Sequence, residues 1–149
     1  MITIHQATIY DLDALAPLFD NYRQFYGQRS DVVAAREFLL NRFRHFESVI
    51  FVASRDNESI GFTQLYPSFS SISMARIYVL SDLFVASAAR KHGVGRLLLE
   101  AAARFGQSVG AHQLTLETAT TNLAAQSLYK ACGWTRDTEF YVYQITLES

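Results

Sequence analysis

The segment Arg90-Lys91-His92-Gly93-Val94-Gly95 combines cationic side chains with two glycines. A helix-like pattern follows it. The first amides of a helix have no internal acceptor, and the aligned peptide dipoles place partial positive charge at the same end. Phosphate binds readily there, and glycine lets it approach bare backbone. The segment therefore predicts a site for one phosphorylated small molecule, with Arg90, Lys91 and Arg96 adding positive charge.

Two other phosphate motifs do not fit this segment. A dinucleotide fingerprint needs a third glycine three residues after Gly95, where Leu98 stands. A Walker-type loop needs Lys and then Ser or Thr after its last glycine, whereas Arg96 and Leu97 follow Gly95. Taken alone, the two glycines fit a simple turn equally well. The secondary structure around them must therefore distinguish a phosphate site from a turn without a ligand.

The hydrophobic pattern predicts those elements. A strand over 75–85 precedes the glycines and an amphipathic helix over 94–109 follows them. The other expected strands are 2–7, 49–54, 59–66, 112–118 and 139–147, and the other helices run from an Asp11 cap to Gly27, over 33–46, and from Asn122 to Gly133. This order, β-α-α-β-β-β-α-β-α-β, predicts an α/β fold with a mixed sheet and helices on both faces.

The pattern Arg90-x-x-Gly93-x-Gly95 between a strand and a helix resembles the cofactor motif of the GNAT N-acetyltransferase superfamily. The resemblance covers nearly the whole chain, because the element order also matches. It implies a mostly antiparallel sheet that splays into a V near residues 83–85, with a bulge in the 75–85 strand. It also implies acetyl-CoA as donor. The cofactor-binding residues would be Leu83, Phe84, Val85, Arg90, Lys91, His92, Gly93, Val94, Gly95, Arg96, Asn122, Ser127 and Tyr129.

Tyr129 is the residue that the resemblance implies as general acid. Acetyl transfer to an amine is helped by an acid near the departing thiolate, and a tyrosine hydroxyl with a pKa of about 10 can lend that proton. The alternative is a packed helix aromatic whose hydroxyl has a local partner. Asn122 also has two interpretations, which are not exclusive: it caps its helix, or it contacts the cofactor through water.

The sequence does not identify the general base that would deprotonate the amine. Ser81 stands where relatives such as polyamine acetyltransferases carry a glutamate. Strand alternation should point Asp82 to the opposite face. Glu117, on the next strand, could act through water, or it is an ordinary surface carboxylate, and bulk water could serve instead. No Cys/His cluster has metal-ligand spacing, so no metal site is expected.

Aromatic residues are expected to shape the acceptor side. In the family the first two helices and the 66–74 loop form the amine pocket. Tyr22, Tyr26, Tyr66 and Tyr78 could form a cage around an amine, since aromatic faces attract cations, with Asp82 as a further contact. The same rings could simply fill the core. The acceptor is expected to be a small-molecule or peptide primary amine.

Length and composition limit the remaining classes. The 149 residues fit one domain over 1–149, and half of them are hydrophobic. The net charge of −1, with scattered basic residues, argues against nucleic acid. One cysteine, no signal peptide and no long apolar run favour the cytoplasm and no membrane partner. The 139–147 strand could pair across a homodimer edge or pack within the monomer.

Two functions are compatible with these features. The first is an acetyl-CoA-dependent N-acetyltransferase in which the amine attacks directly in a ternary complex. The second is a non-catalytic acyl-CoA-binding sensor or regulatory module. Tyr129 separates the two, because a binding module has no need of an acid.

Overall fold

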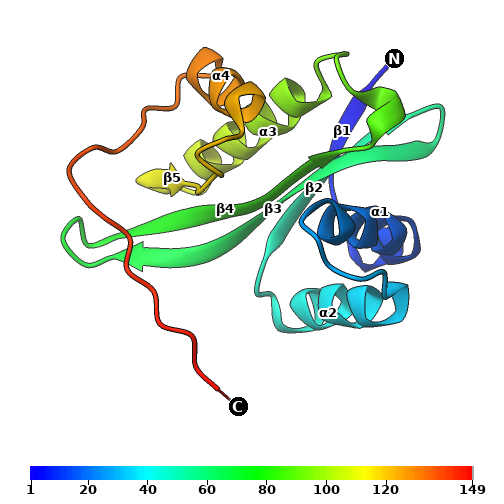
Figure 1. The fold of residues 1–149 in the computed structure, drawn as a ribbon, viewed down its shortest axis with the longest axis horizontal. Coiled ribbons are helices and arrows are strands. Elements are labelled where there is room, and N and C mark those ends of the chain that lie inside the picture. The colour runs from blue at the N-terminus through cyan, green and yellow to red at the C-terminus, as the bar shows by residue number, and fades with distance from the viewer. Residues whose placement is uncertain (149) are drawn as a thin grey trace. The chain divides into compact units, whose positions relative to one another are not determined.

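A five-stranded sheet organises the protein in the computed structural model, which describes residues 1–148. The chain forms two compact units, Met1–Glu117 and the residues from Thr118 onward, and each is described by itself. The sheet lies in the first unit, with its strands side by side in chain order (Figure 1). They are β1 (Thr3–Gln6), β2 (Val49–Arg55), β3 (Glu58–Ser70), β4 (Ala75–Val85) and β5 (Gln113–Thr115). The first four pair antiparallel, and only β4 and β5 run parallel.

Three helices cover the two faces of this sheet (Figure 1). The helices α1 (Leu12–Phe25) and α2 (Val32–His45) pack on one face, and α3 (Val94–Ser108) packs on the other. The core between the sheet and the first two helices is apolar and includes Leu15, Phe19, Leu39, Phe62 and Phe84. The expected α/β architecture is therefore confirmed. No helix among the described residues is long and apolar enough to cross a membrane.

The helix caps agree with the sequence except at Asp11. The Asp31 carboxylate caps α2 by accepting from the amide of Ala34 at 3.0 Å, as expected. Asp11 precedes α1 but makes no cap bond to it. Its carboxylate instead accepts from the Thr8 amide at 2.8 Å, which closes a capping box on the short 3₁₀ helix η1 (Ile9–Asp11). The cap prediction at Asp11 was wrong because this earlier turn competes for the side chain.

The bulge expected in the 75–85 strand is present and lies at Ser81. Gln64 pairs with Asp82 and Leu65 pairs with Leu80, so Ser81 is the extra residue on β4. A bulge bends its strand and leaves the extra residue outside the ladder. Beyond it, no strand of the described residues pairs with β4 on the β5 side, since β5 pairs only with Ile77–Val79. The sheet thus opens between β4 and β5 at the C-terminal half of β4.

Gly61 allows close packing where β3 passes between β4 and α3. A Cβ atom at this position would lie 3.0 Å from the Phe84 carbonyl oxygen and 3.2 Å from Cγ1 of Val94. Both contacts are shorter than ordinary van der Waals separation, and the first is with backbone. Gly61 therefore sets how closely the first residue of α3 can approach the sheet.

Up to residue 148, the second unit contains one helix, α4 (Leu123–Ala131), followed by an extended chain. Residues 139–147 do not form the strand that their alternating pattern predicts, and no strand follows α4 within residues 1–148. Tyr141, Tyr143 and Ile145 are exposed. A strand needs a neighbour to accept and donate its backbone hydrogen bonds, and alternation alone does not supply one. The strand expected over 112–118 is likewise shorter, and only Gln113–Thr115 pair.

Candidate active site

The turn between β4 and α3 presents the first backbone amides of a helix. Lys91 and Gly93 adopt left-handed conformations, with φ of 67° and 79°. The turn starts after the 3₁₀ helix η2 (Ser87–Ala89), and Gly93 occupies the cap position of α3. The first hydrogen bond of α3 runs from the Leu97 amide to the Gly93 carbonyl, so the amides of Val94, Gly95 and Arg96 precede it. The first turn carries no acidic residue, which leaves the positive end of the helix dipole uncancelled.

The second half of β4 has a backbone edge that no strand of the described residues covers. The Ala86 amide donates to the Ile60 carbonyl of the neighbouring strand at 2.8 Å. Because antiparallel pairing alternates, the backbone groups of Leu83 and Val85 point away from β3, toward the opening beside β5. This edge leads directly into the turn that presents the first amides of α3. A ligand with a strand-like arm and a phosphate could bind along both.

Arg90 links this edge to α1. Its Nε atom donates to the Val85 carbonyl at 2.9 Å. Its guanidinium lies 5.4 Å from the centre of the Phe25 ring and 5.6 Å from that of Phe84. The sequence predicts a phosphate contact for this residue, and the structure shows its side chain turned toward the strand. His92 and Lys91 are exposed beside it.

On the α1 face of the sheet, four of the five predicted acceptor residues lie together. Tyr22 stacks edge-on against Tyr26, with ring centres 5.2 Å apart, and its hydroxyl donates to the Ser81 carbonyl at 3.3 Å. Asp82 is 6% exposed on the same face. Tyr66 is half-buried and interacts electrostatically with Asp82. These four side chains surround the β4 bulge.

Tyr78 does not belong to this group. Its ring packs edge-on against Phe105 of α3, with centres 5.2 Å apart, on the opposite face of the sheet. The prediction of a four-tyrosine cage was therefore wrong at this position. Tyr66 and Tyr78 fall on different faces because β3 and β4 pair Tyr66 with Val79 and Tyr78 with Pro67.

Burial dominates the electrostatics around Asp82. It raises the pKa of the Asp82 carboxyl, while hydrogen bonds from Gln64, Tyr22 and Ser81 act in the opposite direction. Burial and the nearby Asp82 charge raise the pKa of Tyr66 to about 12. The same two causes, in the same order, raise the pKa of Tyr22. Both tyrosines therefore stay protonated at neutral pH.

The two other base candidates are exposed. Ser81 is the bulge residue and is exposed, yet its side chain hydrogen-bonds to Asp82, so the expectation that alternation separates the two was wrong at the bulge. Glu117 lies beyond the end of β5, outside any strand, and is solvent-exposed. Among the described residues no group of His, Cys, Asp and Glu has the arrangement of a metal site.

Gln64 is a site residue that the sequence prediction missed. It is fully buried and faces Asp82 across the β3–β4 ladder. The signal was present in the sequence, because Thr63 and Gln64 interrupt an otherwise apolar strand at Ile60-Gly61-Phe62 and Leu65. A polar side chain at a position patterned for the core requires a partner or a function.

The second unit contains the predicted acid. Tyr129 lies on α4, 6.2 Å from Trp134 between ring centres, and the Trp134 amide donates to the Tyr129 carbonyl at 3.0 Å. The Asn122 side chain accepts from the Ala125 amide at 3.1 Å, which confirms its capping role. Ser127 is exposed on the same helix.

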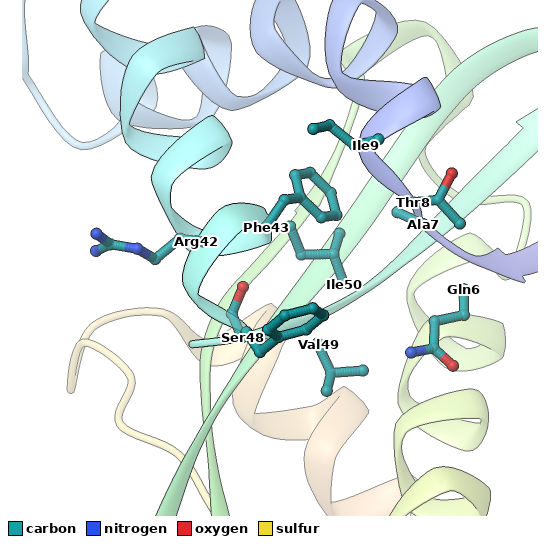
Figure 2. Close-up of a pocket in the computed structure, with 10 residues that line it drawn as sticks. Gln6, Ala7, Thr8, Ile9, Arg42, Phe43, Ser48, Val49 and Ile50 are labelled. Atoms are coloured by element: carbon teal, nitrogen blue, oxygen red, sulfur yellow. The ribbon is translucent and has the colours of Figure 1, made fainter.

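A separate hollow of about 390 Å³ lies between the end of β1, the start of β2 and the end of α2 (Figure 2). Phe43, Val49 and Ile50 give it an apolar lining, and Arg42 and Thr8 stand at its margin. None of the predicted catalytic or cofactor residues lines it. This hollow is therefore not the site that the glycine turn and β4 define.

The fold and the β4–α3 turn together define an acyltransferase class of protein. A sequence model described as the Acetyltransferase (GNAT) family matches residues 12–134, and the chain belongs to this family. It is 50% identical over 142 residues, 95% of each chain, to an uncharacterized N-acetyltransferase, YhfO, of Bacillus subtilis (strain 168).

Two solved structures agree with this assignment. A crystal structure of a probable acetyltransferase is 42% identical, covers 99% of both chains and superposes with a TM-score of 0.93. An aminoglycoside N-acetyltransferase, AAC(6')-Iy, crystallised in complex with CoA, superposes with a TM-score of 0.79 over 99% of this chain and 96% of its own. At 20% identity, that second likeness concerns the fold alone.

Proposed function

We propose that this protein is an acetyl-CoA-dependent N-acetyltransferase that acetylates a primary amine by direct attack in a ternary complex. The observation that supports the proposal is the continuity of the outward-facing edge of β4 with the first amides of α3. An acyl-CoA has the matching chemistry, since its pantetheine arm bears amides and its pyrophosphate is anionic. The relatives described above support the choice of acetyl.

The residues present fit such a donor. Leu83 and Val85 would pair with the pantetheine amides, whereas Phe84 pairs its backbone with Phe62 of β3, has its ring buried beside α1, and stays a prediction. The amides from Lys91 to Arg96 would hold the pyrophosphate, because the left-handed Lys91 and Gly93 shape the turn around them. When bound, acetyl-CoA supplies an acetyl group activated as a thioester.

Tyr129 is proposed as the general acid, with its hydroxyl proton passing to the departing thiolate. Family resemblance supports this role, and Asn122 and Ser127 on α4 are proposed as cofactor contacts on the same ground. Ser81 and Glu117 remain predicted candidates for the general base, and each would act on the amine through a water molecule. The acceptor is proposed to be a small-molecule or peptide amine that enters on the side of Tyr22 and Tyr26.

The exposed segment 139–147 supports a further proposal, a homodimer joined through this segment. Its apolar residues Tyr141, Tyr143, Ile145 and Leu147 are 81–91% exposed. Light scattering of the full chain and of a chain ending at residue 138 measures this directly. A monomeric mass for the full chain would exclude the dimer.

A CoA-release assay tests the function. Acetyl-CoA is offered with polyamines, amino acids, aminoglycosides and N-terminal peptides, and at least one amine is expected to release CoA. The Tyr129→Phe variant should lose turnover about 100-fold with little change in CoA affinity. Tyr10→Phe, which alters an exposed ring, is the matched control. Unchanged turnover in Tyr129→Phe excludes the acid role, and CoA binding without release by any amine indicates the sensor module.

A further inference from the structure

The hollow in Figure 2 lies apart from the residues proposed to bind the donor and the acceptor. Phe43 from the end of α2 and Val49 and Ile50 from the start of β2 give it an apolar wall, and Ile9 from η1 stands at its rim. Its volume of about 390 Å³ falls within the roughly 300–1,000 Å³ that small-molecule sites occupy. The hollow therefore has room for one small molecule with an apolar body.

Phe46, which also lines the hollow, has a backbone conformation that a phenylalanine rarely adopts. It ends α2 in the left-handed region, with φ of 53° and ψ of 44°, where glycine is the usual residue. The backbone bond that closes this helix end, from the Glu47 amide to the Arg42 carbonyl at 3.0 Å, does not need the ring. The ring is 90% exposed, so core packing does not explain it either. A large apolar ring at a strained and exposed position suits a binding role.

Arg42 brings a hydrogen-bond donor to the same hollow. Its Nε atom is buried and has no hydrogen-bond partner among the described residues. Oε1 of Glu47 lies 3.2 Å away, close enough for charge attraction but without the alignment of a hydrogen bond. The Glu47 side chain is half exposed, and such surface ion pairs contribute little and exchange readily. A buried N–H group without an acceptor costs free energy, and a carboxylate is the acceptor that a guanidinium binds most strongly.

The charges around the hollow also favour an anion. The last turn of α2 carries Arg42, Arg44 and His45, and Glu47 lies just beyond them. None of the described residues that line the hollow is acidic. Cations at the end of a helix interact favourably with its dipole, which accounts for Arg44 and His45 at the surface. The dipole does not account for the buried Nε of Arg42, because that N–H has no carbonyl or carboxylate partner in the described chain.

We propose that this hollow binds a small carboxylate with an apolar body. The ligand carboxylate replaces Glu47 as the partner of the Arg42 guanidinium, and the body lies along Phe43 and the Phe46 ring. An arginine fork matches a carboxylate with two parallel hydrogen bonds, which a neutral acceptor of similar size does not provide. The site is separate from the donor and amine sites, so the inference does not depend on the function proposed above.

Arg42 also connects the hollow with the acceptor side. Burial and Asp82 raise the pKa of Tyr66 to about 12, and the Arg42 charge acts in the opposite direction. Val49, in the wall of the hollow, pairs with Leu65, the residue before Tyr66. An anion bound to Arg42 thus changes the electrostatic field at Tyr66. A carboxylate in the hollow would act as an effector of the acceptor side, without touching the donor turn.

Calorimetry with sodium octanoate, in the absence of acetyl-CoA, tests the binding. Arg42→Met keeps the apolar stem and should weaken octanoate binding about 10-fold, the scale of one hydrogen bond to a charged group. Arg44→Met, at an exposed position in the same turn, is the matched control and should leave the affinity unchanged. Octan-1-ol, which lacks the charge, should also bind about 10-fold more weakly. No octanoate binding below its micelle concentration, or equal affinity in Arg42→Met and the parent protein, overturns the inference.

Phe46→Gly separates binding from folding. Glycine relieves the left-handed backbone, so the midpoint of thermal unfolding should stay the same or rise. Octanoate binding should nevertheless weaken about 10-fold, because the ligand loses the ring that covers it. Unchanged octanoate affinity in Phe46→Gly overturns the binding role of the ring, whatever happens to the midpoint.

NMR on protein with ¹³C-labelled tyrosine rings tests the connection to the acceptor side. Octanoate should shift the Tyr66 resonance, assigned by its loss in Tyr66→Phe. Tyr78, which packs against Phe105 on the opposite face of the sheet, is the internal control and should not shift. An unmoved Tyr66 resonance at saturating octanoate overturns the effector role.

Discussion

The Nε atom of Arg90 donates a hydrogen bond to the carbonyl oxygen of Val85 at 2.9 Å. This contact joins the turn that presents the first amides of α3 to the strand edge that leads into it. The guanidinium also covers Phe25 at the end of α1, so one side chain connects both proposed substrate sides of the protein.

Removing this connection should weaken donor binding. Arg90→Met keeps an apolar side chain against Phe25 and Phe84 but loses the donor and the charge. We expect the Kd for acetyl-CoA, measured by calorimetry, to rise about 10-fold, which corresponds to one hydrogen bond to a charged group. Arg104→Met, at an exposed position on α3, is the control. Equal affinity in Arg90→Met and the control would show that the contact does not organise the donor site.

Two glycines should respond to alanine with opposite signs. Gly61→Ala places a Cβ atom 3.0 Å from the Phe84 carbonyl oxygen, so β4 or α3 must move. We expect a loss of about 1–3 kcal/mol in the free energy of unfolding, as for other overpacked sites. In Gly106→Ala the close contact at 3.3 Å is only the end of the Leu114 side chain, and α3 gains about 1 kcal/mol of helix propensity. Urea unfolding measures both, and a stable Gly61→Ala would contradict the packing argument.

The strand and turn that define the site could be predicted from sequence because their signals are local. The β-branched run at 75–85 coincides with β4, and Gly93 stands where a left-handed residue begins α3. The bulge was expected only through the family resemblance, and the pairing around Ser81 confirms it. Local pattern and turn chemistry act within a few residues, so a single sequence contains them.

What the sequence did not reveal depends on partners distant in the chain. The importance of Gln64 follows from the register, which places it opposite Asp82. The same register turns Tyr78 toward α3, so this ring does not join the other predicted acceptor tyrosines. The 139–147 segment has a strand pattern but no ladder within the described residues. Register and strand partners are tertiary properties, which alternation alone does not specify.

Asp20 should make the protein sensitive to acid through the α1–α2 connection. Its carboxylate, 4% exposed, accepts from the Asp31 amide at 2.7 Å, the Ser30 hydroxyl at 2.7 Å and Gln24 Nε2 at 3.0 Å. The Asp31 amide and then Ser30 lower the pKa of Asp20 below its ordinary value. A lowered pKa in the folded state gives stability that is present above the unfolded pKa and lost as pH falls through the folded one.

Asp20→Asn should therefore cost about 1–3 kcal/mol in unfolding free energy at pH 7, because an amide cannot accept all three donors. The difference from the parent protein should shrink as the pH drops below 4, which is near the ordinary aspartate pKa of about 3.9. Urea unfolding at several pH values measures the difference, with Asp13→Asn expected within about 1 kcal/mol of the parent protein. A difference that does not vary with pH would mean that the charge of Asp20 has no part in stability.

Asp82→Asn should have the opposite effect on stability. Burial raises the pKa of Asp82, so the folded protein binds this proton more tightly than the unfolded chain does. The resulting stability is present below the unfolded pKa and is lost as pH rises through the folded pKa. Asparagine copies the neutral carboxyl and can still accept from Gln64, so the variant should be more stable at pH 7 by at least about 1 kcal/mol, the scale of relieving a poorly paired buried group.

That gain should disappear near pH 4 and below, where the parent carboxyl is itself protonated. Thermal unfolding at pH 7 and at pH 4 measures both values, and the CoA-release assay measures turnover on the same samples. A variant that is more stable at pH 7 yet poor in turnover would identify Asp82 as a residue kept for its charge at a cost in stability, the usual pattern at functional sites. A less stable variant at pH 7 would instead show that the Asp82 carboxylate holds β3 and β4 together, and its kinetic loss could then be ascribed to structure.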